Sequence, residues 1–430
     1  MWLQTTSVSE RRAMLAAFAG YGLDGFDVMV YTFIIPTLIA LWGMSNAQAG
    51  YIGSAALLTS AAGGWGAGVL ADRFGRVRIL QLTVLWYAVF TCLSGFTHSY
   101  PELLFARSMQ GFGFGGEWSV GSVLVAETIE ARHRGKAVGV VQSSWSFGWA
   151  LAACGFWAAS ALLPPQLGWR VLFWVGILPA LLIVYIRRNV REPAVYVRMR
   201  ARQGRAGAAA VSRSGFLDIF RPPLLRNTVL ATLLATGALA AYYSVTIWLP
   251  TFLETERHLS VSGRTGYLLM LIVGSLAGYL TSAWLSDVLG RRRNFMLFAG
   301  CGALLIFAYT HMPVSGGMLL IGFPLGFFIL GIFSGMGACF AELFPDEVRG
   351  SGQGFCYNTG RAVGAVCPSL IGIWSAHISL GQSIAGMTIG AYALVVAAAW
   401  ALPETRGREF CAEAGAAPRV VGERRVMGEP

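Results

Sequence analysis

Charged side chains are scarce in this sequence. Asp, Glu, Lys and Arg together make up 12% of the 430 residues, whereas hydrophobic residues make up 55%. Soluble domains usually carry about 25% charged residues, so this composition excludes a soluble globular protein. Apolar stretches long enough to cross a hydrocarbon core of about 30 Å recur along the whole chain. The sequence therefore predicts an all-α membrane protein with many spans.

Several catalytic signatures are also missing. No G-x-x-x-x-G-K-[ST] sequence is present, which disfavours an ATP-driven pump. The run "GFGFGG" fits G-x-G-x-x-G, but no strand precedes it, so we attribute these glycines to close helix packing. The five histidines and seven cysteines show no metal-type spacing, and no nucleophile–base set is apparent. We therefore expect a protein that is not an enzyme and has no cofactor and no metal site.

The distribution of basic residues predicts the topology. All but five of the 32 Lys and Arg residues fall on segments that lie on one side of the membrane if the chain spans it twelve times. The positive-inside rule puts that side, with both termini, in the cytosol. The net charge of +11 thus reflects topology, and we do not expect nucleic-acid binding or a cleaved signal peptide. The expected spans, to within several residues, are 13–42, 48–70, 79–98, 102–127, 136–163, 168–187, 224–253, 265–286, 294–312, 316–343, 352–376 and 382–402.

An internal repeat divides the chain into two halves. "GVLADRFGRVR" (68–78) recurs as "AWLSDVLGRRR" (283–293), and "AETIEARHRGKAVG" (126–139) recurs as "AELFPDEVRGSGQG" (341–354), both at an offset of 215 positions. A weaker echo relates "REP" to "LPETRG". Each half crosses the membrane six times, so the second half begins on the same side as the first. The two halves therefore have the same orientation and form a parallel repeat. The expected divisions are two six-helix bundles, 1–187 and 224–402, a cytoplasmic linker, 188–223, and a cytoplasmic tail, 403–430.

These motifs resemble those of the major facilitator superfamily. "GVLADRFGRVR" is similar to the signature G-x-x-x-D-R-x-G-R-R, and "RSMQG" resembles the fourth-helix motif R-x-x-Q-G. "LDGFD", "GFGGEWSVGSVLVAE" and "GWRVLFWVGILPALLIVYIRRNVREP" resemble the sialate:proton symporter group, whose relatives carry lactate and pyruvate. The "DGFD" element is shared with aromatic-acid:proton symporters. The resemblance implies proton-coupled uptake of a small organic carboxylate by alternating access between the two bundles.

Two acids interrupt the first expected span. A carboxylate near the bilayer centre costs roughly 2.5–3.5 kcal/mol on the insertion scale, so Asp24 and Asp27 need an explanation. A spacing of three residues puts them on neighbouring parts of one helix face, where their protonation should be coupled. On the fourth span, Arg107 and Glu117 lie about 15 Å apart and cannot pair with each other. The resemblance implies that Arg107 exchanges a salt bridge with Asp27 for a proton, and the alternative is a static buried pair.

One arginine inside the second half is a candidate for binding an anionic substrate. Arg361 is the sole arginine in the membrane region of that half, and a guanidinium can donate two parallel hydrogen bonds to a carboxylate. The alternative is a structural arginine bound to helix carbonyls or to an acid. Polar and aromatic residues near the expected midplane complete the candidate cavity, although each alone is also compatible with packing: Tyr31, Gln142, Trp145, Tyr242, Tyr243, Trp248, Tyr357 and Asn358.

Charged residues at the cytoplasmic helix ends are candidates for gating. The resemblance implies that Asp72 meets the end of a neighbouring helix and a basic residue, which holds the cytoplasmic side shut. The alternative is that these residues only determine topology. The second copy departs from the pattern at Ala283 and Val288. The gating candidates are Asp72, Arg73, Arg76, Glu127, Arg134, Asp287, Arg291, Glu342 and Arg349.

The combined prediction is a secondary active transporter of the cell inner membrane. It takes up a small organic carboxylate together with protons, contacts the lipid bilayer and acts as a monomer. A facilitator or symporter for sugars or polyols is the alternative within transport. A transporter-like sensor is the alternative from another class, and it would need a signalling domain that the tail after Leu402 does not supply.

Overall fold

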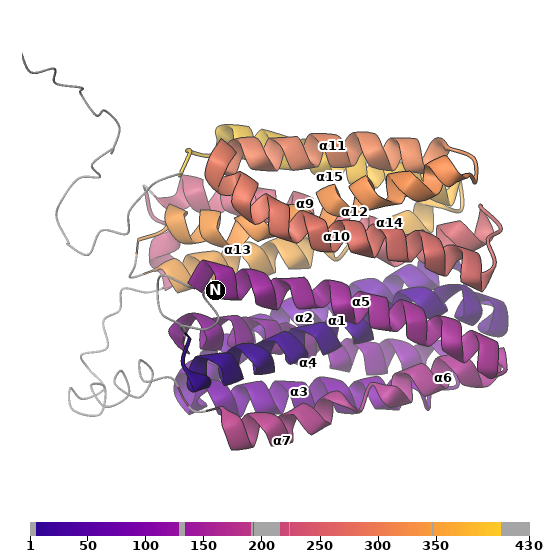
Figure 1. Ribbon diagram of the computed structural model, residues 1–430, viewed down its shortest axis with the longest axis horizontal. Coiled ribbons are helices and arrows are strands. Elements are labelled where there is room, and N and C mark those ends of the chain that lie inside the picture. Colours follow the sequence, from indigo (N-terminus) through magenta and orange to yellow (C-terminus); the bar gives the residue numbers. More distant parts are fainter. Residues whose placement is uncertain are drawn as a thin grey trace, which may run out of the picture.

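Long apolar helices build the part of the chain that the computed structural model describes, which is residues 6–128, 134–190, 192, 216–222, 224–345 and 348–405. The helices lie side by side in two bundles (Figure 1). The N-terminal bundle contains α1 (Val8–Trp42), α2 (Asn46–Phe74), α3 (Arg76–Ser94), α4 (Tyr100–Thr128), α5 (Arg134–Leu162), α6 (Pro165–Val175) and α7 (Pro179–Asn189). The C-terminal bundle contains the short helix η3 (Phe216–Phe220), α9 (Leu224–Thr255), α10 (Val261–Leu289), α11 (Arg291–His311), α12 (Gly316–Leu343), α13 (Arg349–Gly364), α14 (Cys367–Trp374) and α15 (Leu380–Ala401).

Serine caps begin several of these helices. The Ser7 hydroxyl accepts a hydrogen bond from the Glu10 backbone, and the Glu10 side chain accepts one from the Ser7 backbone. Ser45 and Gln48 form the same reciprocal pair at the start of α2. These contacts satisfy backbone N–H groups that have no partner within the helix. Single serine caps also precede three helices of the second bundle, at Ser260, Ser315 and Ser379.

Two of the expected spans are interrupted, which corrects the prediction of continuous helices at 168–187 and 352–376. A turn at 176–178 separates α6 from α7, and a second interruption at 365–366 separates α13 from α14. Prolines explain both breaks, because Pro179 and Pro368 lack the N–H that would continue the helical ladder. Each broken pair still crosses the bundle once. The expected all-α fold with twelve membrane-spanning passages is confirmed for the described residues.

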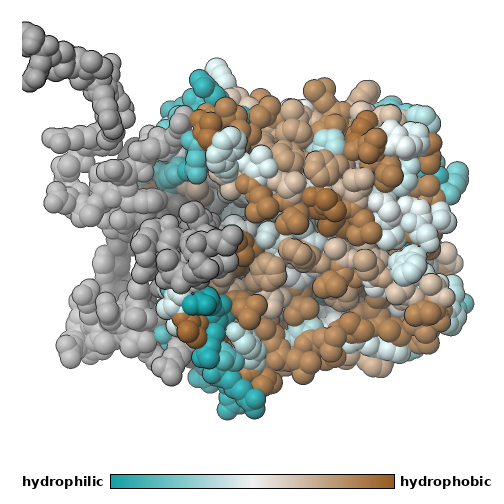
Figure 2. All heavy atoms as spheres, in the orientation of Figure 1, coloured by the Kyte–Doolittle hydropathy of each residue, from teal (hydrophilic) through white to brown (hydrophobic). Residues whose placement is uncertain are grey.

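The outer surface matches a bilayer. Within the described residues, nine passages are by themselves long and apolar enough to span a membrane. The other three, α4, α5 and α13 with α14, include the passages that carry Arg107, Glu117 and Arg361. Figure 2 shows apolar side chains over the flank of the helices and hydrophilic ones gathered toward the two ends. The chain is therefore a multi-pass membrane protein.

The packing of helices repeats between the two bundles. In the first bundle α2 packs on α4 and α1 packs on α5, and in the second α10 packs on α12 and α9 packs on α13. Contacts between the bundles are also paired, because α2 meets α13 and α14 while α5 meets α10. These equivalences are those expected for a parallel repeat of six passages. The linker and tail lie mostly outside the described residues, so the expected domain boundaries stay predictions.

Small residues join the two bundles at one end. We call the end where α1 begins and α15 finishes the terminal end, and the opposite one the far end. Toward the far end, the Ser54 and Ser369 hydroxyls are 2.7 Å apart, and the Asn46 amide donates to Ser375 at 3.0 Å. A Cβ on Gly50 would lie 2.5 Å from the Pro368 carbonyl oxygen. The bundles are thus in backbone contact at the far end.

Glycines within α4 allow equally close packing inside the first bundle. A Cβ on Gly113 would lie 2.6 Å from the Tyr87 backbone nitrogen of α3, and one on Gly115 would collide with the Ser60 carbonyl of α2. The expectation that "GFGFGG" serves helix packing is confirmed by these contacts. Such an approach maximises van der Waals contact where lipid supplies no hydrophobic driving force.

We expect Gly115→Ala to destabilise the protein, because the added methyl group meets the α2 backbone, which cannot yield as a flexible side chain can. Overpacking of this kind typically costs about 1–3 kcal/mol. Gly66→Ala is the matched control, because no atom lies within 4 Å of a Cβ built there. Thermal unfolding of both purified variants in detergent checks the prediction. Equal melting temperatures for the two variants would contradict it.

Candidate functional site

A cavity lies between the bundles in the terminal half of the molecule. It measures about 80 Å³ and is lined by residues of α1, α4, α5, α12 and α13. Substrate pockets usually measure about 300–1,000 Å³, so the cavity is constricted in this conformation but has room for several waters. The residues that line it are Ala17, Tyr21, Glu117, Gly121, Val125, Val141, Gln142, Phe333, Met336, Gly337, Phe340, Gln353 and Tyr357.

The acid and arginine predicted on helices α1 and α4 lie together in the interior. An Arg107 nitrogen is 3.5 Å from an Asp27 carboxylate oxygen, and both side chains are almost completely buried. The Gln110 amide donates a hydrogen bond to the second Asp27 oxygen. The ring of Tyr31 lies under the guanidinium, 5.3 Å from its carbon. Asp27 therefore has a charged and a neutral partner, as a buried carboxylate requires.

A pair of acids, Asp24 and Glu117, connects this ion pair to the cavity. The Asp24 carboxyl faces the Glu117 carboxyl and the Tyr87 hydroxyl, although neither Asp24 oxygen makes a well-formed hydrogen bond within the described structure. Both acids are buried, and only Glu117 lines the cavity. Gly20 leaves the space for the Glu117 carboxyl, which a Cβ at that position would meet. The two carboxyl groups therefore face each other in a medium of low dielectric, where their interaction is strong.

Aromatic rings surround Arg361, which does not itself line the cavity. Arg361 lies one helical turn beyond Tyr357, which lines the cavity, and its guanidinium carbon is 5.1 Å from the Tyr357 ring centre. The same carbon is 5.3 Å from the ring centre of Phe114, in the other bundle. The hydroxyls of Tyr243 and Tyr357 lie within hydrogen-bonding reach of the guanidinium. Arg361 is thus a buried cation at the contact between the bundles.

Trp145 extends this aromatic set across the first bundle. Its ring centre lies 5.1 Å from that of Tyr21, 6.2 Å from that of Phe114 and 6.4 Å from that of Tyr242. The Tyr242 ring in turn packs edge-on against Phe333 at 5.5 Å. The Trp145 indole N–H and the Tyr242 hydroxyl are buried without hydrogen-bond partners in the described structure. The set therefore combines flat apolar faces with donors that a bound polar molecule could satisfy.

The other predicted substrate residues lie in different places. Gln142 lines the cavity. Asn358 is buried and its amide donates to the Gly354 carbonyl, which leaves its side-chain oxygen without a partner. The Tyr31 hydroxyl donates to the Ala49 carbonyl, and the Trp248 indole donates to a carbonyl of α14. Tyr31 and Trp248 therefore join helices to one another. Of the predicted substrate residues, only Gln142 and Tyr357 line the cavity in the described structure, which corrects the expectation for the others.

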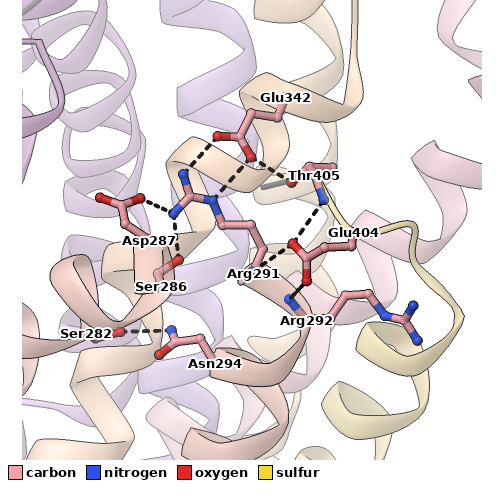
Figure 3. A network of polar contacts seen from close by, with 9 residues as sticks. All are labelled: Ser282, Ser286, Asp287, Arg291, Arg292, Asn294, Glu342, Glu404 and Thr405. Carbon is pink, nitrogen blue, oxygen red and sulfur yellow. Dashed lines mark hydrogen bonds and ion pairs between the residues drawn. The ribbon is translucent and has the colours of Figure 1, made fainter. Parts of the chain in front are cut away.

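Three predicted gating residues of the second bundle form one network at the terminal end. Arg291 binds the two Glu342 oxygens through two of its nitrogens, at 2.9 and 3.2 Å, and binds Asp287 at 2.6 Å (Figure 3). Thr405, beyond α15, donates to the same Glu342 carboxylate at 2.6 Å. The network thus ties α10, α11 and α12 to the segment that follows α15. The gating role of these residues stays a prediction.

A carboxylate caps the corresponding helix in each bundle. Glu192 accepts hydrogen bonds from the Arg76 and Val77 backbone nitrogens at the start of α3. Glu404 accepts them from the Arg291 and Arg292 backbone nitrogens at the start of α11. The echo between "REP" and "LPETRG" therefore has a physical basis, because each glutamate binds the positive end of a helix. Of the remaining gating candidates, Arg73 is exposed and Arg76 is buried. The side chains of Asp72, Glu127, Arg134 and Arg349 lie outside the described residues.

A charged contact between the bundles at the far end was not predicted from the sequence. Arg264 at the start of α10 pairs with Glu254 of α9, and its guanidinium carbon lies 4.6 Å from the ring centre of Phe156 in α5. The neighbouring Trp157 indole donates to the Ser262 hydroxyl across the same contact. A buried cation above a ring contributes roughly 0.5–2 kcal/mol. The far end is thus closed by side chains as well as by backbone contact.

The sequence analysis also failed to identify other residues of the site, although the sequence contained a pattern that could have identified some of them. Gln110 is the glutamine of the "RSMQG" motif, one turn after Arg107, so the motif itself marked it. Tyr21 precedes Asp24 by one turn on α1, so helical periodicity places both on one face. No local sequence pattern identifies Phe333, Gln353 or Phe114, because only the packing of the bundles brings the first two to the cavity and the third to Arg361.

This arrangement of helices and motifs has known counterparts. The sequence pattern described as Major Facilitator Superfamily matches residues 17–368. The chain belongs to this superfamily. The resemblance seen in the signature motifs is therefore confirmed, as is the expectation that the chain is a transporter and not an enzyme. Major facilitator transporters bind substrate near the midplane between two bundles, and here both the cavity and Arg361 lie between the bundles.

Curated relatives of this major facilitator protein are transporters from bacteria. A protein of Cupriavidus pinatubonensis (strain JMP 134 / LMG 1197), named "Probable 4-methylmuconolactone transporter", is 39% identical, covering 94% of this chain and 93% of that one. The "Cis,cis-muconate transport protein" of Acinetobacter baylyi is 31% identical, covering 86% and 88%. Among solved structures, a D-xylose-proton symporter matches with a TM-score of 0.73 at 20% identity, covering 93% and 99%, which shows the shared fold.

We expect a disulfide between cysteines placed at Ser54 and Ser369 to block transport, because the two hydroxyls are 2.7 Å apart across the far-end contact. Alternating access requires this contact to separate. Uptake into proteoliposomes before oxidation, after oxidation and after reduction checks the prediction, with each single cysteine variant as a control. Full transport by the cross-linked protein would show that the far end need not open.

Proposed function

We propose that this transporter takes up a small aromatic or unsaturated organic carboxylate together with protons. The observation that carries the proposal is Arg361, a cation buried between the two bundles and adjacent to Tyr357, which lines the cavity. A guanidinium presents paired N–H groups that match a carboxylate. Its position next to Phe114 of one bundle and Tyr357 of the other lets one anion contact both halves of the protein.

The rings around Arg361 favour a flat substrate. The Trp145 ring centre lies 5.1 Å from that of Tyr21 and 6.4 Å from that of Tyr242, and Phe333 packs against Tyr242. Planar conjugated molecules stack on such faces, whereas a saturated sugar would leave the arginine without a counter-ion. Two relatives carry names that fit this chemistry, because methylmuconolactone and muconate are unsaturated acids or acid derivatives. A sugar would find polar partners in the cavity, among them the amides of Gln142 and Gln353 and the hydroxyl of Tyr357, but it would supply no counter-ion for Arg361.

The buried acids support proton coupling. Along α1, successive turns run from the cavity at Tyr21 to Asp24 and then to Asp27. Glu117 reaches the cavity on one side and faces Asp24 on the other. A proton that enters from the cavity therefore meets Glu117 first and the Asp27–Arg107 ion pair last. Protonation of Asp27 would release Arg107, which couples proton binding to the packing of α1 on α4.

The conformation supports alternating access with the far end closed. The contacts at Ser54, Ser146 and Arg264 join the bundles from the midplane to the far end, while the cavity lies in the terminal half. The positive-inside rule places the terminal end in the cytosol. We infer that this is an inward-facing state of a monomer in the cell inner membrane, with both termini cytoplasmic.

Arg361→Lys should lower carboxylate uptake at least about tenfold, because lysine keeps the charge and loses the two-pronged contact, and a hydrogen bond to a charged group contributes about 1.5–3 kcal/mol. Arg170→Lys is the matched control, since Arg170 lies near the far end and donates to the Gly95 carbonyl. Uptake of a labelled panel of aromatic acids, aliphatic acids and sugars into vesicles checks the prediction. Full carboxylate uptake by Arg361→Lys would remove this residue from the binding site.

Asp27→Asn should abolish accumulation driven by a proton gradient and spare exchange of substrate across the membrane. The amide keeps the size of the side chain and a hydrogen bond with Gln110, but it cannot bind and release a proton. The measurement compares uptake under an inward proton gradient with counterflow at equal pH in the same proteoliposomes. Continued proton-driven accumulation by the variant would refute the coupling role of Asp27.

A further inference from the structure

A second cavity lies on the outer face of the C-terminal bundle. It measures about 440 Å³ and runs between α11 and α15, where it is lined by Ala299, Gly300 and Ala303 on one side and by residues from Ile389 to Trp400 on the other. We call it the α11–α15 groove. Small side chains on α11 create the space, since no atom lies within 4 Å of a Cβ built on Gly300. The groove is separate from the substrate cavity and has no part in the proposed transport mechanism.

The dimensions of the groove fit one leaflet of a bilayer. Eleven helical steps separate Ile389 from Trp400, which corresponds to about 16 Å along α15. This is about half of a hydrocarbon core of about 30 Å. Trp400 is 72% exposed at the terminal end of the groove, as is typical of an indole at a membrane interface. The apolar part of the groove therefore extends from the interface to the region of the membrane midplane.

Two arginines lie at the terminal end of the groove. Arg292 and Arg293 precede Ala299 and Gly300 by seven residues each, so they share one face of α11 with them. Arg292 donates to the Ala399 carbonyl at 3.1 Å and to the Trp400 carbonyl, which places its guanidinium beside the end of the groove. Arg293 is exposed. The groove is thus apolar along its length and positively charged at its interfacial end.

We propose that the α11–α15 groove binds an anionic phospholipid. One acyl chain lies along α15 between Ile389 and Trp400, and the phosphate and headgroup lie against Arg292 and Arg293. Charge complementarity distinguishes this occupant from a zwitterionic lipid, because each basic residue near the surface contributes about 1 kcal/mol toward an anionic headgroup. A second copy packed through the same groove is disfavoured, because it would bring the arginines at the end of the groove against arginines.

Native mass spectrometry of the purified full chain tests the proposal, with phosphatidylglycerol and phosphatidylcholine of identical acyl chains as probes. The wild-type protein should retain phosphatidylglycerol preferentially. Gly300→Phe should lose this binding, because the ring fills the groove. Arg293→Gln should weaken it about fivefold, which is the fold-change for about 1 kcal/mol per charge. All variants should be monomeric.

Matched controls come from the other bundle. Gly66→Phe adds the same ring to an exposed, unobstructed glycine of α2, and Arg78→Gln removes the arginine that stands at the repeat position of Arg293. Both should retain phosphatidylglycerol like the wild type. Equal retention of the two lipids, or unchanged binding by Gly300→Phe, would overturn the proposal. A dimer that Gly300→Phe abolishes would also overturn it, because the groove would then be an interface between copies.

Discussion

The ion pair between Asp27 and Arg107 joins α1 to α4 in an interior where neither charge can be hydrated. A buried carboxylate without a partner would destabilise the bundle by several kcal/mol, so the surrounding helices must hold both groups in register. Gln110 satisfies the second oxygen, and the Tyr31 ring lies under the guanidinium. In the proposed mechanism a proton on Asp27 weakens this pair, so the contact that joins α1 to α4 would also make their packing responsive to protons.

Close approach of helices is the second requirement, and small residues provide it. Glycines of α4 bring α2 and α3 near enough to enclose the buried charges, while Gly50 and Ser54 let the two bundles meet at the far end. Contacts made by serine hydroxyls and glycine backbones bury little area and can separate at modest cost. The bundles are therefore in contact at the far end and enclose a narrow cavity in the terminal half. The Arg264 contact with Phe156 adds a specific, charged element to this closure.

Helical periodicity and motif spacing predicted much of the site. The resemblance carried by "LDGFD" and "RSMQG" led us to expect that Asp27 and Arg107 meet, and they do. Asp287, Arg291 and Glu342 were each gating candidates, but that these three form one network became evident only from the structure. Other features depend on contacts between helices that no local pattern records. Tyr31 and Trp248 were expected in the cavity, but their polar atoms bind backbone carbonyls of neighbouring helices instead. The interruptions near Pro179 and Pro368 were missed because the apolar runs continue through both positions.

The amino-acid sequence by itself determined the membrane setting, the number of passages and the duplication, because hydrophobic length, charge placement and repeat offset are properties of the chain. It also singled out the buried charges, since each is costly wherever its helix packs. Tertiary structure alone decided which rings surround Arg361, that Glu117 connects the cavity to Asp24, and that the bundles close at the far end. These features depend on the rotation of each helix about its axis and on the fit between two bundles. Residues far apart in the chain set both, through contacts that are absent until the helices pack.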